Sequence, residues 1–195
     1  MLKRILKDYE AESLGLTPGG VSSKISKLKN ELIDADAYAS RVNPNDPNEV
    51  MFLDIFRRYT TELRKANAFD FDDLIAETVF LFREFPEVAA QYQRKFRHIL
   101  VDEYQDTNHA QYMLVKELTG TEGDGFPIAE LCVVGDADQS IYGFRGATIR
   151  NILQFEVDYP NAATVLLEQN YRSTQNILNA ANAVITQNES RKEKN

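Results

Sequence analysis

The chain has 195 residues and a formal net charge of −8, and its 43% hydrophobic and 27% charged residues are typical of a soluble globular protein of one domain or two small ones. Its single cysteine, Cys132, excludes an internal disulfide, and no apolar run approaches the ~18 residues that a membrane span needs. The start of the chain lacks the apolar segment of a secretory signal, so we expect a cytoplasmic protein with no membrane partner.

The first half of the chain has the pattern of a helical protein. A short amphipathic stretch covers residues 1–12, and a Thr-Pro-Gly-Gly turn follows at 17–20. Apolar residues at helical spacing predict further helices: one capped by Ser22 or Ser23, one over 48–66, one capped by Asp70, and one from Pro86 to about Phe96. Residues 1–97 are almost neutral, with 15 basic and 16 acidic side chains, although their first thirty residues are locally basic.

The second half changes to short apolar runs that alternate with helical patterns. The runs lie at 99–101, 131–134 and 164–167, and the helical patterns at about 108–119, 148–158 and 174–187. This alternation predicts a parallel sheet covered on both faces, with the ligand site at the carboxyl ends of its strands. We expect Cys132, in the middle of the second run, to lie in the core. This half is acidic, with 7 basic and 14 acidic side chains.

Two adjacent carboxylates follow the first apolar run. An apolar strand that delivers Asp102 and Glu103 to a sheet edge has the Walker B arrangement. The first acid can hold Mg²⁺ through its water shell, and the second can deprotonate the water that attacks a γ-phosphate. A solvated strand end is the alternative interpretation, since acids are common there.

The loops after the second and third runs carry further polar and aromatic residues. Gln139 can sense a phosphate at the sheet edge, and Tyr142, Phe144 and Arg145 suit stacking on single-stranded bases. The alternative is that these two aromatics belong to the core, as most aromatics do.

The third run leads into a Tyr-Arg pair. Arg172 can reach a phosphate, and Tyr171 offers a face to a purine base. The alternative is that Arg172 forms a surface salt bridge.

Taken together, and in this order, three segments resemble motifs II, III and IV of the superfamily 1A DNA helicases of the UvrD/Rep/PcrA family. They are DEYQDT at 102–107, VVGDADQSIYGFRGA at 133–147 and LEQNYRST at 167–174, and FDFDDL at 69–74 matches a further segment of that family. We expect the PcrA branch to be the nearest. The resemblance implies an α/β fold: a helical insert like subdomain 1B with connecting helices at 1–96, and a partial RecA-like P-loop NTPase domain, the later part of 1A, at 97–195.

The resemblance also implies roles around a nucleotide. Asp102 matches the Mg²⁺-binding acid and Glu103 the catalytic base. Gln139 matches the glutamine that contacts the γ-phosphate and couples it to DNA. Arg172 matches an arginine that stabilises transition-state charge, and Tyr171 a tyrosine that stacks on adenine. ATP and Mg²⁺ are thus the cofactors that the resemblance implies for the complete protein.

For DNA, the resemblance implies stacking by Tyr142 and Phe144, with Arg145 beside them. The family usually has tryptophan at the position of Phe144, and this chain has no tryptophan; phenylalanine still stacks, with a smaller face. The partners implied are single-stranded and duplex DNA and the rest of the helicase chain. Candidates for phosphate contacts in the helical half are Lys24, Lys27 and Lys29.

One element of the family is missing from the 195 residues: no segment reads G-x-x-x-x-G-K-[S/T], the loop that cradles phosphates. We therefore expect a fragment of an ATP-dependent 3′–5′ DNA helicase of repair or replication, which by itself hydrolyses no ATP. In the family, the strand with this loop lies between the second and third strands described above. Without it, we expect a rearranged sheet or pairing of strand edges between chains.

Two other functions fit parts of the pattern. A non-catalytic DNA-binding or protein-interaction module could keep this scaffold without ATPase activity. A metal-dependent nuclease would need four acids to converge on a metal ion, namely Asp102, Glu103, Asp136 and Asp138.

Overall fold

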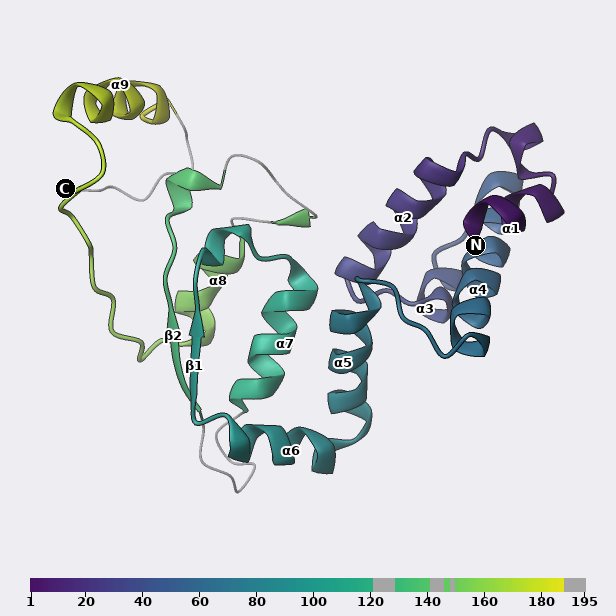
Figure 1. Cartoon of the computed structure of the whole chain (residues 1–195), viewed down its shortest axis with the longest axis horizontal. Helices are drawn as coiled ribbons and strands as arrows, with labels where there is room; N and C mark the ends of the chain where they lie inside the picture. Colours follow the sequence, from purple (N-terminus) through teal and green to yellow (C-terminus); the bar gives the residue numbers. More distant parts are fainter. Residues whose placement is uncertain (121–128, 141–145, 148–149, 188–195) are drawn as a thin grey trace.

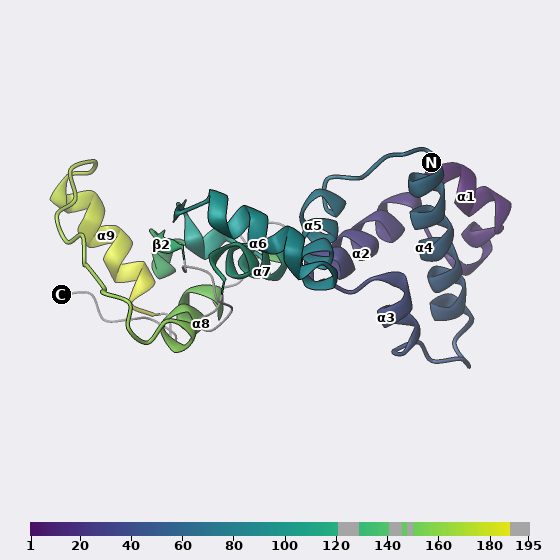
Figure 2. The ribbon, with the colours of Figure 1, turned by 90° about the horizontal axis from the view of Figure 1, so that it is seen from below.

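Helices dominate one end of the molecule. They are α1 (Leu2–Asp8), the 3-10 turn η1 (Ala11–Leu14), α2 (Pro18–Asn30), α3 (Ala35–Ala39) and α4 (Pro47–Lys65). The computed structural model describes residues 1–120, 129–140, 146–147 and 150–187. Figure 1 shows α1–α4 together at one end and the two strands toward the other, and Figure 2 shows that the molecule is elongated.

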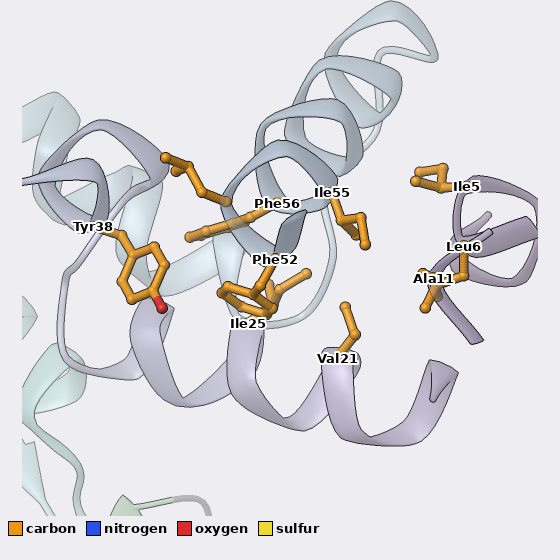
Figure 3. Packing of buried hydrophobic residues seen from close by; sticks show 10 residues of the cluster. Ile5, Leu6, Ala11, Val21, Ile25, Tyr38, Phe52, Ile55 and Phe56 are labelled. Carbon is orange, nitrogen blue, oxygen red and sulfur yellow. The ribbon is translucent and has the colours of Figure 1, made fainter. Parts of the chain in front are cut away.

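The helical end has its own hydrophobic core. Apolar side chains from all of its helices meet there, as Figure 3 shows, and the cluster consists of Ile5, Leu6, Ala11, Val21, Ile25, Tyr38, Phe52, Leu53, Ile55 and Phe56. The ring of Tyr38 meets that of Phe52 edge-on, with 5.3 Å between centroids. Such edge-to-face contacts are favourable beyond the area that they bury. The amphipathic stripes read from the sequence therefore build a real core.

The start of α2 differs from the prediction. Thr17 rather than Ser22 or Ser23 is the N-cap, because its Oγ1 accepts the N–H of Gly20 at 3.2 Å. Pro18 takes the first helical position, where its fixed φ and missing N–H cost nothing. The expected turn at 17–20 is therefore the cap and first turn of the helix.

Three helices form the middle of the molecule: α5 (Asp73–Glu84), α6 (Pro86–Lys95) and α7 (His109–Thr119). Figure 1 shows α5 and α6 beside α7, and the three pack on one another. Val79 and Phe82 of α5 are buried in this packing. The helices predicted from Pro86 and over about 108–119 are confirmed.

In the described part of the chain, the sheet has two parallel strands, β1 (His98–Val101) and β2 (Glu130–Val133), with Ile99 opposite Leu131. The fold is thus α/β with a small parallel sheet, as expected, and α8 (Arg150–Asp158) lies beside the strands (Figure 1). The sheet is open on one face, contrary to the prediction of two covered faces: Leu100 is 79% exposed and Cys132 is exposed beside it. The core position expected for Cys132 was therefore wrong.

The third predicted strand is also wrong. Residues 164–167 form no strand, and Leu167 is 82% exposed. A strand needs a neighbour for its backbone hydrogen bonds, and none of the described residues provides one beside it. This segment leads to α9 (Gln175–Ile185), which has no buried residue and stands apart from α1–α7 in both ribbon views (Figures 1 and 2).

None of the helices in the described ranges is both long enough and apolar enough to cross a membrane.

Candidate active site

Asp102 and Glu103 lie directly after β1, at the carboxyl edge of the sheet, and both are exposed. Oδ1 of Asp102 accepts the backbone N–H of Glu103 at 2.9 Å. This bond helps to hold Glu103 in the left-handed region, at φ 48° and ψ 46°, an unusual conformation for a residue with a side chain. The 3-10 turn η2 (Tyr104–Asp106) follows at once, so the two carboxylates occupy a sharp bend.

A buried glutamine joins this bend to the loop after β2. Gln105 is only 1% exposed. Its Nε2 donates to Oε2 of Glu103 at 2.7 Å, and its Oε1 accepts the backbone N–H of Asp136 at 2.9 Å. Sequence reasoning assigned no role to Gln105, since a glutamine after two acids looks like any other polar residue at a strand end.

The close contact between the two loops depends on a glycine. A Cβ on Gly135 would lie 2.7 Å from Oε1 of Gln105 and 3.2 Å from the backbone nitrogen of Tyr104. The backbone of this loop also continues the sheet ladder, because Val134 donates to Val101 at 2.8 Å and its carbonyl accepts the N–H of Tyr104 at 2.9 Å. The ends of the two strands therefore form one tightly packed unit.

Gln139 lies in the same loop, at the end of the 3-10 turn η3 (Ala137–Gln139). Its Nε2 donates to Oδ2 of Asp136 at 3.0 Å, while Oδ1 of Asp136 accepts the N–H of Asp138 at 3.0 Å. The structure thus places Gln139 and Glu103 on neighbouring loops, connected through Asp136 and Gln105.

Helix α8 packs against the bend. The ring of Tyr104 meets that of Phe155 edge-on, with 5.7 Å between centroids, and burial raises the pKa of the Tyr104 hydroxyl above its usual value. Nδ2 of Asn151 donates to the carbonyl of Thr107 at 2.8 Å. Both contacts restrain the segment that follows the two acids.

Tyr171 and Arg172 do not reach this edge. Both are exposed, Tyr171 by 93%, and the backbone N–H groups of Arg172 and Ser173 donate to Oδ1 of Asn170 at 2.9 Å each, which closes the turn locally. Among the described residues, no ion pair links Arg172 to an acid.

The predicted DNA contacts have mixed outcomes. Tyr142, Phe144 and Arg145 lie outside the described residues. The hypothesis of a phosphate contact requires an exposed lysine, but Lys29 is buried. Its side chain is 6% exposed, and its Nζ lies 2.6 Å from carboxylate oxygens of both Asp70 and Asp73.

Its two neighbours on α2 remain exposed. The Nζ of Lys24 lies over the ring of Phe52, 4.1 Å from its centroid, and Lys27 also faces solvent. The hypothesis of a phosphate contact therefore stands for Lys24 and Lys27 only.

The acids at the sheet edge do not form a metal cluster. Within the described part of the chain, no group of three or more His, Cys, Asp or Glu residues is placed to hold an ion. The nuclease hypothesis therefore lacks its required site. A single exposed carboxylate such as Asp102 does suit Mg²⁺, which keeps several waters and combines one or two carboxylates with substrate phosphates.

Comparison with known proteins extends this picture. A family model described as the UvrD/REP helicase N-terminal domain matches residues 1–160. The ATP-dependent DNA helicases UvrD1 of Mycobacterium tuberculosis and PcrA of Bacillus subtilis are 56% and 50% identical to the chain over all of its length. The chain spans about a quarter of the length of these curated relatives, 25% of each. UvrD1 is thus more similar than PcrA, contrary to the expectation of a PcrA-like chain.

Proposed function

The chain belongs to the family of the UvrD/REP helicase N-terminal domain, and from this premise we propose that it works as part of an ATP-dependent DNA helicase. The observation that carries the proposal is the bend after β1, where exposed Asp102 and Glu103 are joined through Gln105 to the loop of Gln139. Residues 1–96 form the helical, 1B-like part of this proposal, and residues 97–195 the part with the motifs.

The two acids have separate tasks in the proposed reaction. Asp102 would hold Mg²⁺, which with its waters neutralises phosphate charge when ATP is bound. Glu103 accepts the proton of the attacking water, so its carboxylate must stay both ionised and oriented. The hydrogen bond from Gln105 to Oε2 supports that orientation.

Three further residues would complete the proposed nucleotide site. Gln139 contacts the γ-phosphate, Arg172 stabilises transition-state charge and Tyr171 stacks on adenine. For the last two, residues 164–167 must pair as a strand beside the sheet, which brings the turn at Asn170 to its edge. The proposed substrate is DNA, along which the helicase moves 3′–5′ on a single strand as it unwinds duplex.

The DNA-binding side of the proposal rests on residues 141–145, which follow η3 in the sequence. Tyr142 and Phe144 would stack on single-stranded bases, with Arg145 beside them. Stacking of this kind tolerates any base sequence, as a translocating helicase requires.

The test uses a helicase of full length that carries these residues. The unchanged protein should hydrolyse ATP faster when single-stranded DNA is added. Glu103→Gln should still bind an ATP analogue but lose turnover by a factor of about 10² to 10⁴, the usual contribution of a general base. Glu87→Gln on α6 is the control and should keep full activity. Normal turnover by Glu103→Gln would refute the base assignment.

A second measurement uses the 195-residue chain alone, where we expect no ATP turnover. Phosphoryl transfer depends on positioning and charge neutralisation, and these residues include no phosphate-cradling loop with its lysine. DNA-stimulated hydrolysis by the purified chain would contradict this. If the full-length protein also binds DNA without hydrolysing ATP, the non-catalytic module is the better function.

A further inference from the structure

The side chain of Gln105 is a buried polar group at the sheet edge. It is 1% exposed, so water does not compete for its hydrogen bonds. Both ends of its amide are used, with bonds of 2.7 Å to Glu103 and 2.9 Å to Asp136. A buried amide that is satisfied at both ends fixes the groups that it binds, because losing either bond leaves an unpaired polar atom.

The two partners determine which way the amide points. A carboxylate only accepts hydrogen bonds, so the NH₂ group must face Glu103; a backbone N–H only donates, so the carbonyl oxygen must face Asp136. No other side chain of this length satisfies both partners. Glutamate would set two carboxylates against each other, and leucine would remove both of these hydrogen bonds.

The packing of the loop makes this link sensitive to movement. Gly135 has no room for a Cβ, which would lie 2.7 Å from Oε1 of Gln105. A shift of the Asp136 backbone must therefore push or release Oε1. The same loop carries Gln139, three residues further on.

We propose that Gln105 is a positioning residue, which holds the Glu103 carboxylate in its orientation and makes that orientation depend on the loop of Gln139. The inference rests on the proposed function, in which Glu103 is the base. Binding events that move this loop then change the rate of hydrolysis through Gln105, without a direct contact between the loop and Glu103.

The kinetic test compares Gln105→Leu and Gln105→Glu with the unchanged full-length helicase. For both variants we expect kcat of DNA-stimulated ATP hydrolysis to fall by about 10²-fold, the cost of a misplaced catalytic group, and KM for ATP to stay within about twofold. Gly135→Ala displaces Oε1 of Gln105 from the side of the second loop, so it should also lower kcat and leave KM for ATP almost unchanged. Gln91→Ala, an exposed glutamine of α6, is the control and should change neither constant.

Amide hydrogen exchange tests the link without activity, in the 195-residue chain itself. The N–H of Asp136 should exchange slowly in the unchanged chain and at least about tenfold faster in Gln105→Leu, because it loses its acceptor. Unchanged exchange, unchanged kcat, or equal changes in kcat and KM would overturn the proposal. If the unchanged full-length helicase shows no DNA-stimulated turnover, the proposed function fails instead, and the exchange result still decides whether the link exists.

Discussion

At the residue scale, the proposed base, Glu103, has a backbone conformation that is sterically unfavourable for a residue with a side chain. Glu103 has φ 48°, where an L-residue is less stable by about 1–2 kcal/mol than in the right-handed region. Two hydrogen bonds maintain this conformation. The N–H of Glu103 donates to Asp102, and Gln105 donates to the carboxylate of Glu103. The bend therefore places the carboxylate at the sheet edge at some expense of stability.

Replacing Glu103 should reveal this strain. We expect Glu103→Gly to be more stable than Glu103→Ala by about 1 kcal/mol in free energy of unfolding, since glycine adopts positive φ without the steric cost that a Cβ brings. At Gln91, in the exposed middle of α6, the order should reverse, with alanine better by about 1 kcal/mol. Urea unfolding of the four variants measures both differences. Alanine better than glycine at both sites would show that Glu103 is unstrained.

Some residues of this site were predictable, and others were not. The position of Asp102 and Glu103 at the sheet edge was predictable, because an apolar run followed by two acids can be recognised from local sequence. Gln105 and Gly135 were not, because their roles arise where two loops far apart in the chain touch. Lys29 was misread, because its charge partners Asp70 and Asp73 lie some forty residues further along the chain and a lysine is usually a surface residue.

At the element scale, the last turn of α2 connects the helical end of the molecule to its middle. Lys29 binds Asp70 and Asp73 at the start of α5. Asn30 donates to Asp72 at 3.1 Å and accepts from Asn108 at 2.6 Å. Because Asn108 also caps α7, this buried polar junction fixes α2 against the starts of both helices.

Removing the charge of Lys29 should destabilise this junction strongly. In Lys29→Met, the carboxylates of Asp70 and Asp73 lose their buried partner, which typically reduces the free energy of unfolding by about 3–5 kcal/mol. The double variant Lys29→Met/Asp73→Asn should recover part of the loss, because one unpaired charge is gone. Chemical unfolding gives both values. A loss below about 1 kcal/mol in the single variant would mean that solvent screens the junction.

Acid should weaken the same junction. Burial alone would raise the pKa of the Asp70 carboxyl, but hydrogen bonds from Lys29, Tyr59 and the backbone of Asp73, with the charge of Lys29, hold it below the usual value. The unfolded chain therefore binds this proton first, and stability falls as pH drops below about 4. Asp70→Asn should flatten that part of the curve of unfolding free energy against pH. An equally steep curve in the variant would place the acid sensitivity elsewhere.

The elements themselves were predictable to different degrees. The helices α6 and α7 and both strands follow from local pattern, proline and apolar runs, and all are confirmed. The short helix α3 carried no periodic signal. Residues 164–167 have the composition of a strand but lack a neighbour, and no local pattern reveals whether the neighbour is present.

At the scale of the whole molecule, the sheet side is unusually open. Leu100 on β1 is 79% exposed, and Leu167, in the segment between α8 and α9, is 82% exposed. Apolar surface and free strand edges of this kind favour contacts with other chains. The self-association expected from the sequence stays a prediction, and the structure supplies the surface for it.

We expect the 195-residue chain to self-associate as its concentration rises. Leu100→Lys and Leu167→Lys should each shift this equilibrium toward the monomer, because a charge opposes burial of the open face. Val157→Lys, an exposed apolar position on α8, is the control and should have little effect. Sedimentation velocity across a concentration series measures the change. A chain that stays monomeric throughout would contradict the prediction.

The open face of the sheet also holds the sole thiol of the sequence, Cys132. Thiol reagents react only where they can reach the sulfur. Any polypeptide that settles on this face, whether another segment or a second copy, shields the sulfur and slows the reaction. The rate at which a thiol reagent labels Cys132 therefore reports whether the open face is covered, and no probe has to be introduced by mutation.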